Sequence, residues 1–128
     1  VLAIIDTLEA DPSSASSAWA QLSAASLRKR SPLLLHVILE QIRRARSMTL
    51  ADDLRMERDM VRHCFATHHL ERSGTSSETV EGIRALAVDK DHLPQWNPAR
   101  LEEVTPEMVQ AFFISPWPPA AHPLATLT

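Results

Sequence analysis

Residues 31–65, SPLLLHVILEQIRRARSMTLADDLRMERDMVRHCF, contain two helix start signals, each followed by apolar residues at helical spacing. Ser31 precedes Pro32, and the pair predicts a helix start, because serine caps free N–H groups and proline is tolerated at the first helical position. Thr49 opens a second and longer helix, which we expect from about Leu50 to Leu70, with acidic residues in its first turn. The stretch therefore predicts two successive helices joined by a short loop.

Similar signals divide the rest of the chain. We expect a short first helix that ends at Asp11-Pro12 and a second helix capped by Ser13 or Ser14, while Ser77 and Thr105 open two later helices. Apolar stripes at helical spacing are expected to face the core. The stripes are Ala15, Ala18, Trp19, Leu22 and Ala25; Leu34, Leu35, Ile38, Leu39, Ile42 and Ala45; Leu50, Leu54, Val61 and Phe65; Met108, Val109, Phe112 and Phe113.

The helix that begins at Ser77 is apolar round much of its circumference, with Val80, Ile83, Leu86 and Ala87, so we expect it to be buried. Several helices have more apolar surface than the few other helices of a chain this short could cover. This indicates a surface that meets another domain or another copy of the chain.

Glycine is scarce and no segment alternates at period two, which weighs against phosphate loops, dinucleotide fingerprints and hairpins. The sequence therefore predicts an all-α fold of about six helices. We divide it into N-terminal helices at 1–30, a helical region at 31–113, and a proline-rich tail at 114–128 that is expected to be extended or disordered.

The composition is that of an ordinary globular protein, with 45% apolar residues, 23% charged residues and a net charge of −3. Mild acidity argues against a nucleic-acid partner, and no apolar run is long enough to span a membrane. The single cysteine, Cys64, excludes an intrachain disulfide and favours a reducing compartment, so we expect a cytoplasmic protein. Eleven arginines against two lysines hint at a bacterial source, and the start on an apolar stretch without Met suggests a piece of something longer.

His63, Cys64, His68 and His69 form the densest group of candidate metal ligands. Cys64 and His68 lie four residues apart on a helix, which is suitable spacing for half of a zinc site. The sequence places no further ligand nearby, so we expect no metal. A nucleophilic Cys–His pair is also disfavoured, because Cys64 lies in the second half of its helix, where the helix dipole opposes a thiolate.

Glu57 falls on an apolar stripe, and a buried carboxylate must be paired or neutralised. It is a candidate general acid or base, but we favour a structural ion pair with Arg43, Arg44 or Arg84. Trp96 lies between prolines and is interpreted as a packing anchor for an irregular segment.

The run from 81 to 98, EGIRALAVDKDHLPQWNP, resembles a pattern near the end of the 3-hydroxyisobutyryl-CoA hydrolase branch of the enoyl-CoA hydratase/isomerase, or crotonase, superfamily. The stretches 31–32, 49–58 and 101–105 match other parts of that pattern, so the resemblance covers about 31–113. Two departures are visible. Glu78-Thr79 stand where the hydrolases have Asp-Phe, and Ala87 stands where some related enzymes have Phe.

The resemblance implies that an N-terminal spiral domain, outside this chain, binds the acyl-CoA, forms the oxyanion hole and performs the proton transfers. The helices described above would cover the site and build subunit contacts. No catalytic residue is carried over. Lys90 matches a lysine that approaches the adenine and phosphate end of CoA in some relatives, so it is the one candidate cofactor-binding residue.

We therefore expect the C-terminal helical fragment of an enzyme that hydrolyses a short branched β-hydroxyacyl-CoA, as in valine breakdown. The fragment would be inactive alone and part of a homo-oligomer, with CoA entering only as part of the substrate and no other cofactor. The alternatives are an enoyl-CoA hydratase or isomerase and a non-catalytic helical interaction module.

Overall fold

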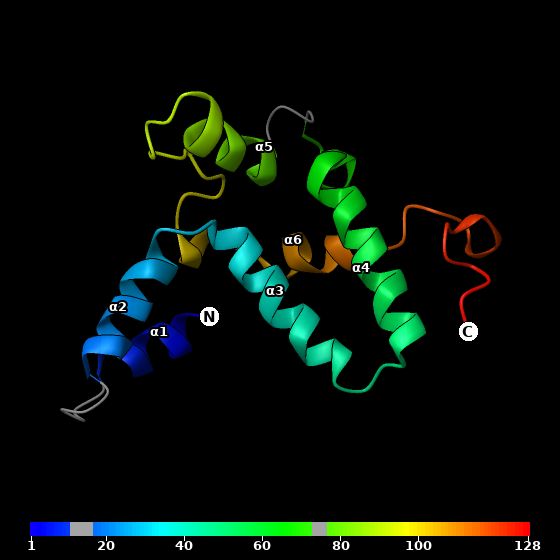
Figure 1. Ribbon diagram of the computed structural model, residues 1–128, viewed down its shortest axis with the longest axis horizontal. Helices are drawn as coiled ribbons and strands as arrows, with labels where there is room; N and C mark the ends of the chain where they lie inside the picture. Colours follow the sequence, from blue (N-terminus) through cyan, green and yellow to red (C-terminus); the bar gives the residue numbers. More distant parts are fainter. Residues whose placement is uncertain (11–16, 73–76) are drawn as a thin grey trace.

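The computed structural model describes residues 1–10, 17–72 and 77–128, and in these ranges it contains six α-helices and no β-strand (Figure 1). The helices are α1 Leu2–Glu9, α2 Ser17–Arg28, α3 Pro32–Ala45, α4 Leu50–Phe65, α5 Glu78–Ile83 and α6 Pro106–Gln110. A π-helix, Arg84–Val88, continues α5, and short 3-10 segments lie at Thr67–Leu70, Leu101–Glu103, Ala111–Phe113 and Pro119–Ala121. The prediction of an all-α fold with about six helices is confirmed.

Four predicted helix starts are confirmed by capping hydrogen bonds of 3.0 to 3.4 Å. In each, a side-chain oxygen accepts the N–H of the residue three positions on, and the capping residues are Ser31, Thr49, Ser77 and Thr105. α4 ends at Phe65, five residues earlier than expected, because Ala66 is extended and a 3-10 turn follows it. The predicted cap at Ser13 or Ser14 and the predicted end at Asp11-Pro12 lie outside the described residues.

α3 and α4 form a hairpin, and α6 lies between them in Figure 1. The main core is built where these three helices meet, from Leu33, Val37, Met56, Met60, Val109 and Phe112. A smaller core of Ile5, Ala24 and Leu101 holds the α1–α2 hairpin against the chain that precedes α6. Two modest cores therefore hold the described fold together.

The apolar stripes predicted to face the core were wrong for α2 and α4, and in part for α3, where Ile38 and Ile42 are exposed and Leu33 and Val37 are buried instead. In α4, Leu50 is 75% exposed and Phe65 is 54% exposed, while Met56 and Met60 are buried. In α2, the exposed residues include Trp19 and Leu22, and the buried ones are Ala20 and Ala24. Each helix has two faces that are apolar enough to be buried, and the neighbouring helix decides between them, which periodicity alone cannot do.

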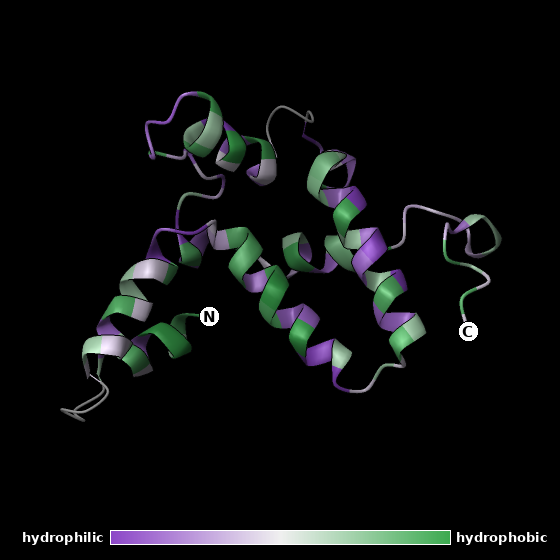
Figure 2. Cartoon of the chain, viewed as in Figure 1, coloured by the Kyte–Doolittle hydropathy of each residue, from purple (hydrophilic) through white to green (hydrophobic). Residues whose placement is uncertain are grey.

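The expectation that the helix after Ser77 is buried was also wrong. Ile83, Leu86 and Val88 are exposed, and Ile38 and Ile42 on α3 are about half exposed. Figure 2 shows hydrophobic residues spread over several helices rather than gathered at one centre. The accessible surface of 8289 Å² exceeds the roughly 6,800 Å² expected for a compact monomer of this mass. The fold is therefore open, with apolar side chains at its surface.

A buried carboxylate, that of Glu78, joins three parts of the chain. Its Oε2 accepts the Ser31 hydroxyl at the start of α3, and its Oε1 accepts the Asn97 N–H at 2.8 Å. The Arg72 guanidinium lies 3.9 Å from Oε1 and donates to the Asn97 carbonyl. Burial raises the pKa of Glu78, and these hydrogen bonds only partly oppose it. The network ties α3, α5 and the segment before α6 together.

Trp96 packs beside this network, and its interpretation as an anchor is confirmed. Its indole N–H donates to the Lys29 carbonyl at 3.2 Å, at the end of the α1–α2 hairpin. A Cβ atom added to Gly82 would lie 3.4 Å from the Trp96 ring, so the ring packs directly on the α5 backbone.

The proline-rich tail folds back along α4, so the expectation of an extended or disordered tail was wrong for this segment. Asp59 accepts the Ser115 hydroxyl at 3.0 Å and lies 3.2 Å from His122 Nε2. Arg55 donates to carbonyl oxygens of the tail, and the Arg58 guanidinium lies 4.9 Å from the centre of the Trp117 ring. These contacts come from one flank of α4, beside the tail in Figure 1.

Replacing Glu78 tests the role of its network. Glu78→Ala leaves the Asn97 N–H and the Ser31 hydroxyl without their acceptor, so we expect a loss of about 1–3 kcal/mol in the free energy of unfolding. Glu78→Gln keeps the shape and one carbonyl oxygen, and it should cost less. Urea denaturation followed by circular dichroism measures both variants.

The same variants give a pH dependence with a defined sign. Between the ordinary glutamate pKa of 4.5 and the raised value, the folded state binds more protons than the unfolded state, so the Glu78 contribution to stability falls as pH rises. The stability of the wild type relative to Glu78→Gln should therefore decrease across this window. A stability difference between the two proteins that does not change with pH would contradict a raised pKa for Glu78.

Candidate functional site

Lys90, the binding residue predicted from the sequence, lies in an exposed loop directly after the π-helix. Lys90 and His92 both adopt left-handed backbone conformations, with φ of 56° and 57°. Such conformations cost about 1–2 kcal/mol for a residue other than glycine, so surrounding contacts must hold them. The Asp89 N–H donates to the Arg84 carbonyl at 2.8 Å, and the His92 N–H donates to the Ala85 carbonyl at 3.0 Å.

One guanidinium, that of Arg84, organises this loop. It grips Glu81 with two hydrogen bonds of 3.0 and 2.8 Å, and its Nη1 lies 2.6 Å from Asp89 and 2.7 Å from Asp91. A fifth hydrogen bond of 3.1 Å goes to the Leu93 carbonyl. The guanidinium lowers the pKa of Glu81 and of Asp91, so both remain ionised. Sequence reasoning considered Arg84 only as a partner for Glu57 and missed this role.

Lys90 is left free by this arrangement. Its side chain makes no hydrogen bond or ion pair with any residue that the structure describes, although an aspartate flanks it on each side in the sequence. Both flanking carboxylates bind Arg84 instead. An exposed ammonium without a local partner can bind an anionic group such as a phosphate.

The histidine and cysteine cluster is part of the core surroundings. The rings of His63 and His69 are 4.1 Å apart and both lie near Phe112. Burial lowers the pKa of His69 to about 4, with His63 adding to the effect, so its ring is neutral near pH 7. Within the described ranges, no three His, Cys, Asp or Glu side chains are grouped so that they could hold a metal ion.

Cys64 is partly buried, and burial raises the pKa of its thiol. His68, the partner that sequence spacing suggested for it, is exposed. Because a cysteine nucleophile acts as the thiolate, this environment disfavours the Cys–His pair that was considered.

The prediction for Glu57 was wrong. The side chain is exposed and accepts a hydrogen bond of 3.0 Å from Gln41, rather than an ion pair from Arg43, Arg44 or Arg84. The stripe that carries Glu57 faces outward, which explains the error.

Asp59 is a buried carboxylate that the sequence reasoning did not consider. Together with Ser115 and His122 it forms a Ser/His/Asp set, but the serine and the histidine both donate to one Asp59 oxygen. His122 Nδ1 accepts the Leu124 N–H at 2.9 Å, so neither ring nitrogen is available to the serine hydroxyl as a base. The set anchors the tail. Asp59 and His122 are 63 residues apart in the sequence, so no local sequence pattern could have indicated that they interact.

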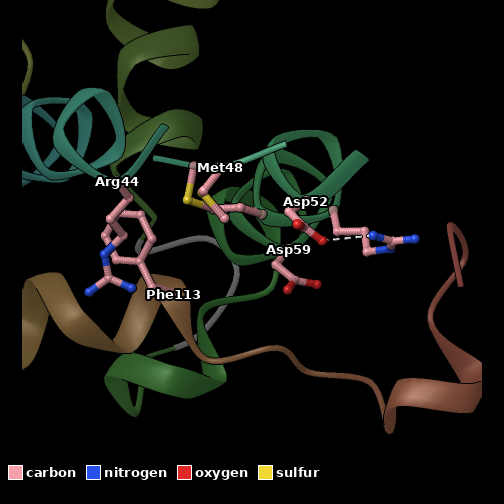
Figure 3. Close-up of a pocket in the computed structure, with 7 residues that line it drawn as sticks. Arg44, Met48, Asp52, Asp59 and Phe113 are labelled. Atoms are coloured by element: carbon pink, nitrogen blue, oxygen red, sulfur yellow. Dashed lines mark hydrogen bonds and ion pairs between the residues drawn. The ribbon is translucent and has the colours of Figure 1, made fainter. Parts of the chain in front are cut away.

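A cavity of about 310 Å³ lies beside this anchor (Figure 3). It is lined by Arg44, Met48, Asp52, Arg55, Met56, Asp59 and Phe113. The Arg44 guanidinium lies over the Phe113 ring at 4.1 Å and pairs with Glu40 at 2.9 Å, while Arg55 pairs with Asp52 at 2.9 Å. These charged groups are already paired, so the cavity offers no unmatched charge to a substrate.

Among the described helices, none has the length and apolar character needed to cross a membrane.

Comparison with known proteins places the chain in a family. The model of the family described as "Enoyl-CoA hydratase/isomerase" matches residues 1–113. "3-hydroxyisobutyryl-CoA hydrolase-like protein 5" of Arabidopsis thaliana is 37% identical over 110 residues, and the "3-hydroxyisobutyryl-CoA hydrolase, mitochondrial" of Bos taurus is 37% identical over 112. A third relative, "Small ribosomal subunit protein mS47" of Arabidopsis thaliana, is 34% identical over 110 residues.

These alignments cover 86% to 88% of this chain but only 25% to 27% of the three relatives, so the chain spans about a quarter of their length. These relatives come from a plant and an animal, so they do not support a bacterial source, and the bovine protein is named as mitochondrial rather than cytoplasmic. The family match begins at residue 1, before the motifs at 31–113, and it stops where the tail begins. The chain therefore belongs to the enoyl-CoA hydratase/isomerase family and corresponds to the C-terminal part of its 3-hydroxyisobutyryl-CoA hydrolase relatives.

Proposed function

We propose that this chain is the C-terminal helical part of an enzyme that hydrolyses 3-hydroxyisobutyryl-CoA, and that it covers the active site and forms an assembly surface. The observation that carries the proposal is its 37% identity to a protein named 3-hydroxyisobutyryl-CoA hydrolase and to another named 3-hydroxyisobutyryl-CoA hydrolase-like. The catalytic groups would lie in the part of those proteins that this chain does not match.

The chemistry of the described side chains supports the absence of catalytic residues here. The Cys64 thiol has a raised pKa, and the Ser115–Asp59–His122 set is engaged in holding the tail. Neither gives an activated nucleophile with a free base beside it, which thioester attack by a side chain would need.

The outer face of the α3–α4 hairpin supports the assembly role. We define this face by the exposed apolar residues of the two helices, which are Ile38, Ile42, Leu50, Leu54, Val61 and Phe65. The hydrogen bond between Gln41 and Glu57 joins the two helices. The surface in excess of a compact monomer, about 1,500 Å², is comparable to the area buried in a standard protein interface.

Lys90 supports a direct contact with the substrate. Its ammonium is exposed and unpaired within the described chain, and it stands in a loop that Arg84 holds in one conformation. The proposed ligand is a phosphate at the adenine end of CoA, bound by a single point charge at the protein surface.

Two alternatives have some support. The family model is described as enoyl-CoA hydratase/isomerase, which is consistent with a hydratase or isomerase parent. The ribosomal relative favours a non-catalytic interaction module, because a protein with 34% identity over the same region is named as a ribosomal subunit. The coding sequence upstream of Val1 discriminates them, since an enzyme needs a spiral domain with an oxyanion hole.

The isolated chain is expected to release no CoA from 3-hydroxyisobutyryl-CoA in a thiol-detection assay, whereas the protein extended by its upstream region should do so. The reason is that, under this proposal, the groups that activate water and stabilise the oxyanion lie in the upstream region. Turnover that rises in proportion to the concentration of the isolated chain would contradict the proposal.

Lys90→Ala in the longer protein is expected to raise KM roughly fivefold with kcat unchanged, equivalent to about 1 kcal/mol of uniform binding. Steady-state kinetics with the CoA thioester and with its 3′-dephospho analogue measure the effect, which should shrink for the analogue. Lys29→Ala removes the only other lysine and is the matched control. An unchanged KM in Lys90→Ala would contradict the proposed contact between Lys90 and the CoA phosphate.

Val61→Asp is expected to weaken self-association of the chain, because it places a charge at the centre of the outer face. Sedimentation velocity over a range of concentrations measures the oligomeric state. Leu93→Asp also adds a charge at an exposed apolar residue, but it lies outside the outer face and should have no effect. A wild-type chain that stays monomeric at high concentration would contradict the assembly role.

A further inference from the structure

We infer that Arg84 is a positioning residue that binds Asp89 and Asp91 and thereby keeps the Lys90 ammonium out of a local ion pair. This inference rests on the proposed contact between Lys90 and a CoA phosphate. Arg84 would not touch the phosphate itself and would affect its binding only through Lys90. It also explains how a lysine between two aspartates stays available to an anion.

The geometry favours Arg84 over Lys90 as the partner of both aspartates. Arg84 donates two hydrogen bonds to Glu81, at 3.0 and 2.8 Å, so the planar guanidinium is held against α5 independently of the loop carboxylates. Its Nη1 then lies 2.6 and 2.7 Å from the two aspartates. A lysine would have to immobilise a flexible four-carbon chain to form a single-point contact with either one.

The backbone of the loop depends on the same guanidinium. The Leu93 carbonyl accepts from Arg84 at 3.1 Å, and the Leu93 N–H donates to Asp91 at 2.9 Å. Lys90 and His92, the two left-handed residues, lie between these fixed points. Loss of Arg84 would therefore free two carboxylates next to Lys90 and also remove the contacts that hold the loop.

The first experiment measures the Lys90 ion pair directly, without any ligand. The chain has only two lysines, so reductive ¹³C-dimethylation gives two lysine signals, and Lys29 serves as an internal reference. Methylation keeps the charge. In wild type the Lys90 methyl signal should be as mobile as that of Lys29. In Arg84→Gln the paired population of Lys90 should rise by about 1.5- to 5-fold, the range typical of exposed ion pairs, with slower methyl relaxation.

Two further variants separate positioning from a general structural role. Arg84→Lys keeps the charge but lacks the planar fork, so Lys90 should again become partly paired. Arg84→Gln combined with Asp89→Asn and Asp91→Asn removes the competing carboxylates, so Lys90 should return to the mobile state. Asp89→Asn combined with Asp91→Asn, with Arg84 unchanged, should alter the Lys90 signal little, because in wild type both aspartates already bind Arg84 rather than Lys90.

The second experiment connects the loop to substrate binding in the longer protein. Arg84→Gln should raise KM for the CoA thioester by about the factor seen for Lys90→Ala, the triple variant should restore it, and Arg84→Gln should add nothing to Lys90→Ala. Circular dichroism of each variant checks that the helices persist.

The outcomes distinguish the inference from the proposed function. If Lys90→Ala raises KM but Arg84→Gln does not, or if the Lys90 methyl signal is the same in wild type and Arg84→Gln, Arg84 does not position Lys90 and the inference fails. If the methyl signal responds to Arg84→Gln but Lys90→Ala leaves KM unchanged, the positioning stands and the CoA contact fails. Failure of the three-residue variant to restore Lys90 mobility would assign Arg84 a structural role only.

Discussion

The buried carboxylate of Glu78 is the constraint on which the described arrangement of helices depends. It accepts hydrogen bonds from the cap of α3 and from the chain before α6 while it stands in the first turn of α5. A carboxylate under such burial is costly unless its acceptors are used, and here both oxygens are used. Glu78 is also one of the positions at which this sequence departs from the hydrolase pattern it resembles. The departure therefore lies where α3, α5 and the segment before α6 are hydrogen-bonded together.

The sequence predicts the helix starts well and the buried faces poorly, for different physical reasons. A cap such as Thr49 needs only the residues within one turn, so its effect is visible locally. The buried face of α4 depends on where α3 and α6 lie, and Leu50 and Met56 are equally suited to a core until those neighbours are placed. Glu57 was misjudged for the same reason.

The candidate site shows the same limit. Lys90 was identifiable because it falls within a family pattern, but the groups that leave it free were not. Arg84 reaches Asp89 and Asp91 at separations of five and seven residues, which are not the pair spacings of a regular α-helix. They become possible because a π-helix widens the turn after α5 and the chain then reverses through left-handed residues. A period of 3.6 residues cannot anticipate either feature.

The docking of the tail on α4 has a consequence for how another body could approach the hairpin. The tail lies outside the family match and contacts the flank of α4 that carries Arg55 and Asp59, while Met56 and Met60 of α4 pack in the main core with residues of α3 and α6. Val61 and Phe65, on the outer face of α4, remain exposed. A partner that approaches α4 from the side of Arg55 and Asp59 would therefore meet the tail first, and a family member without such a tail would leave that flank of the helix open.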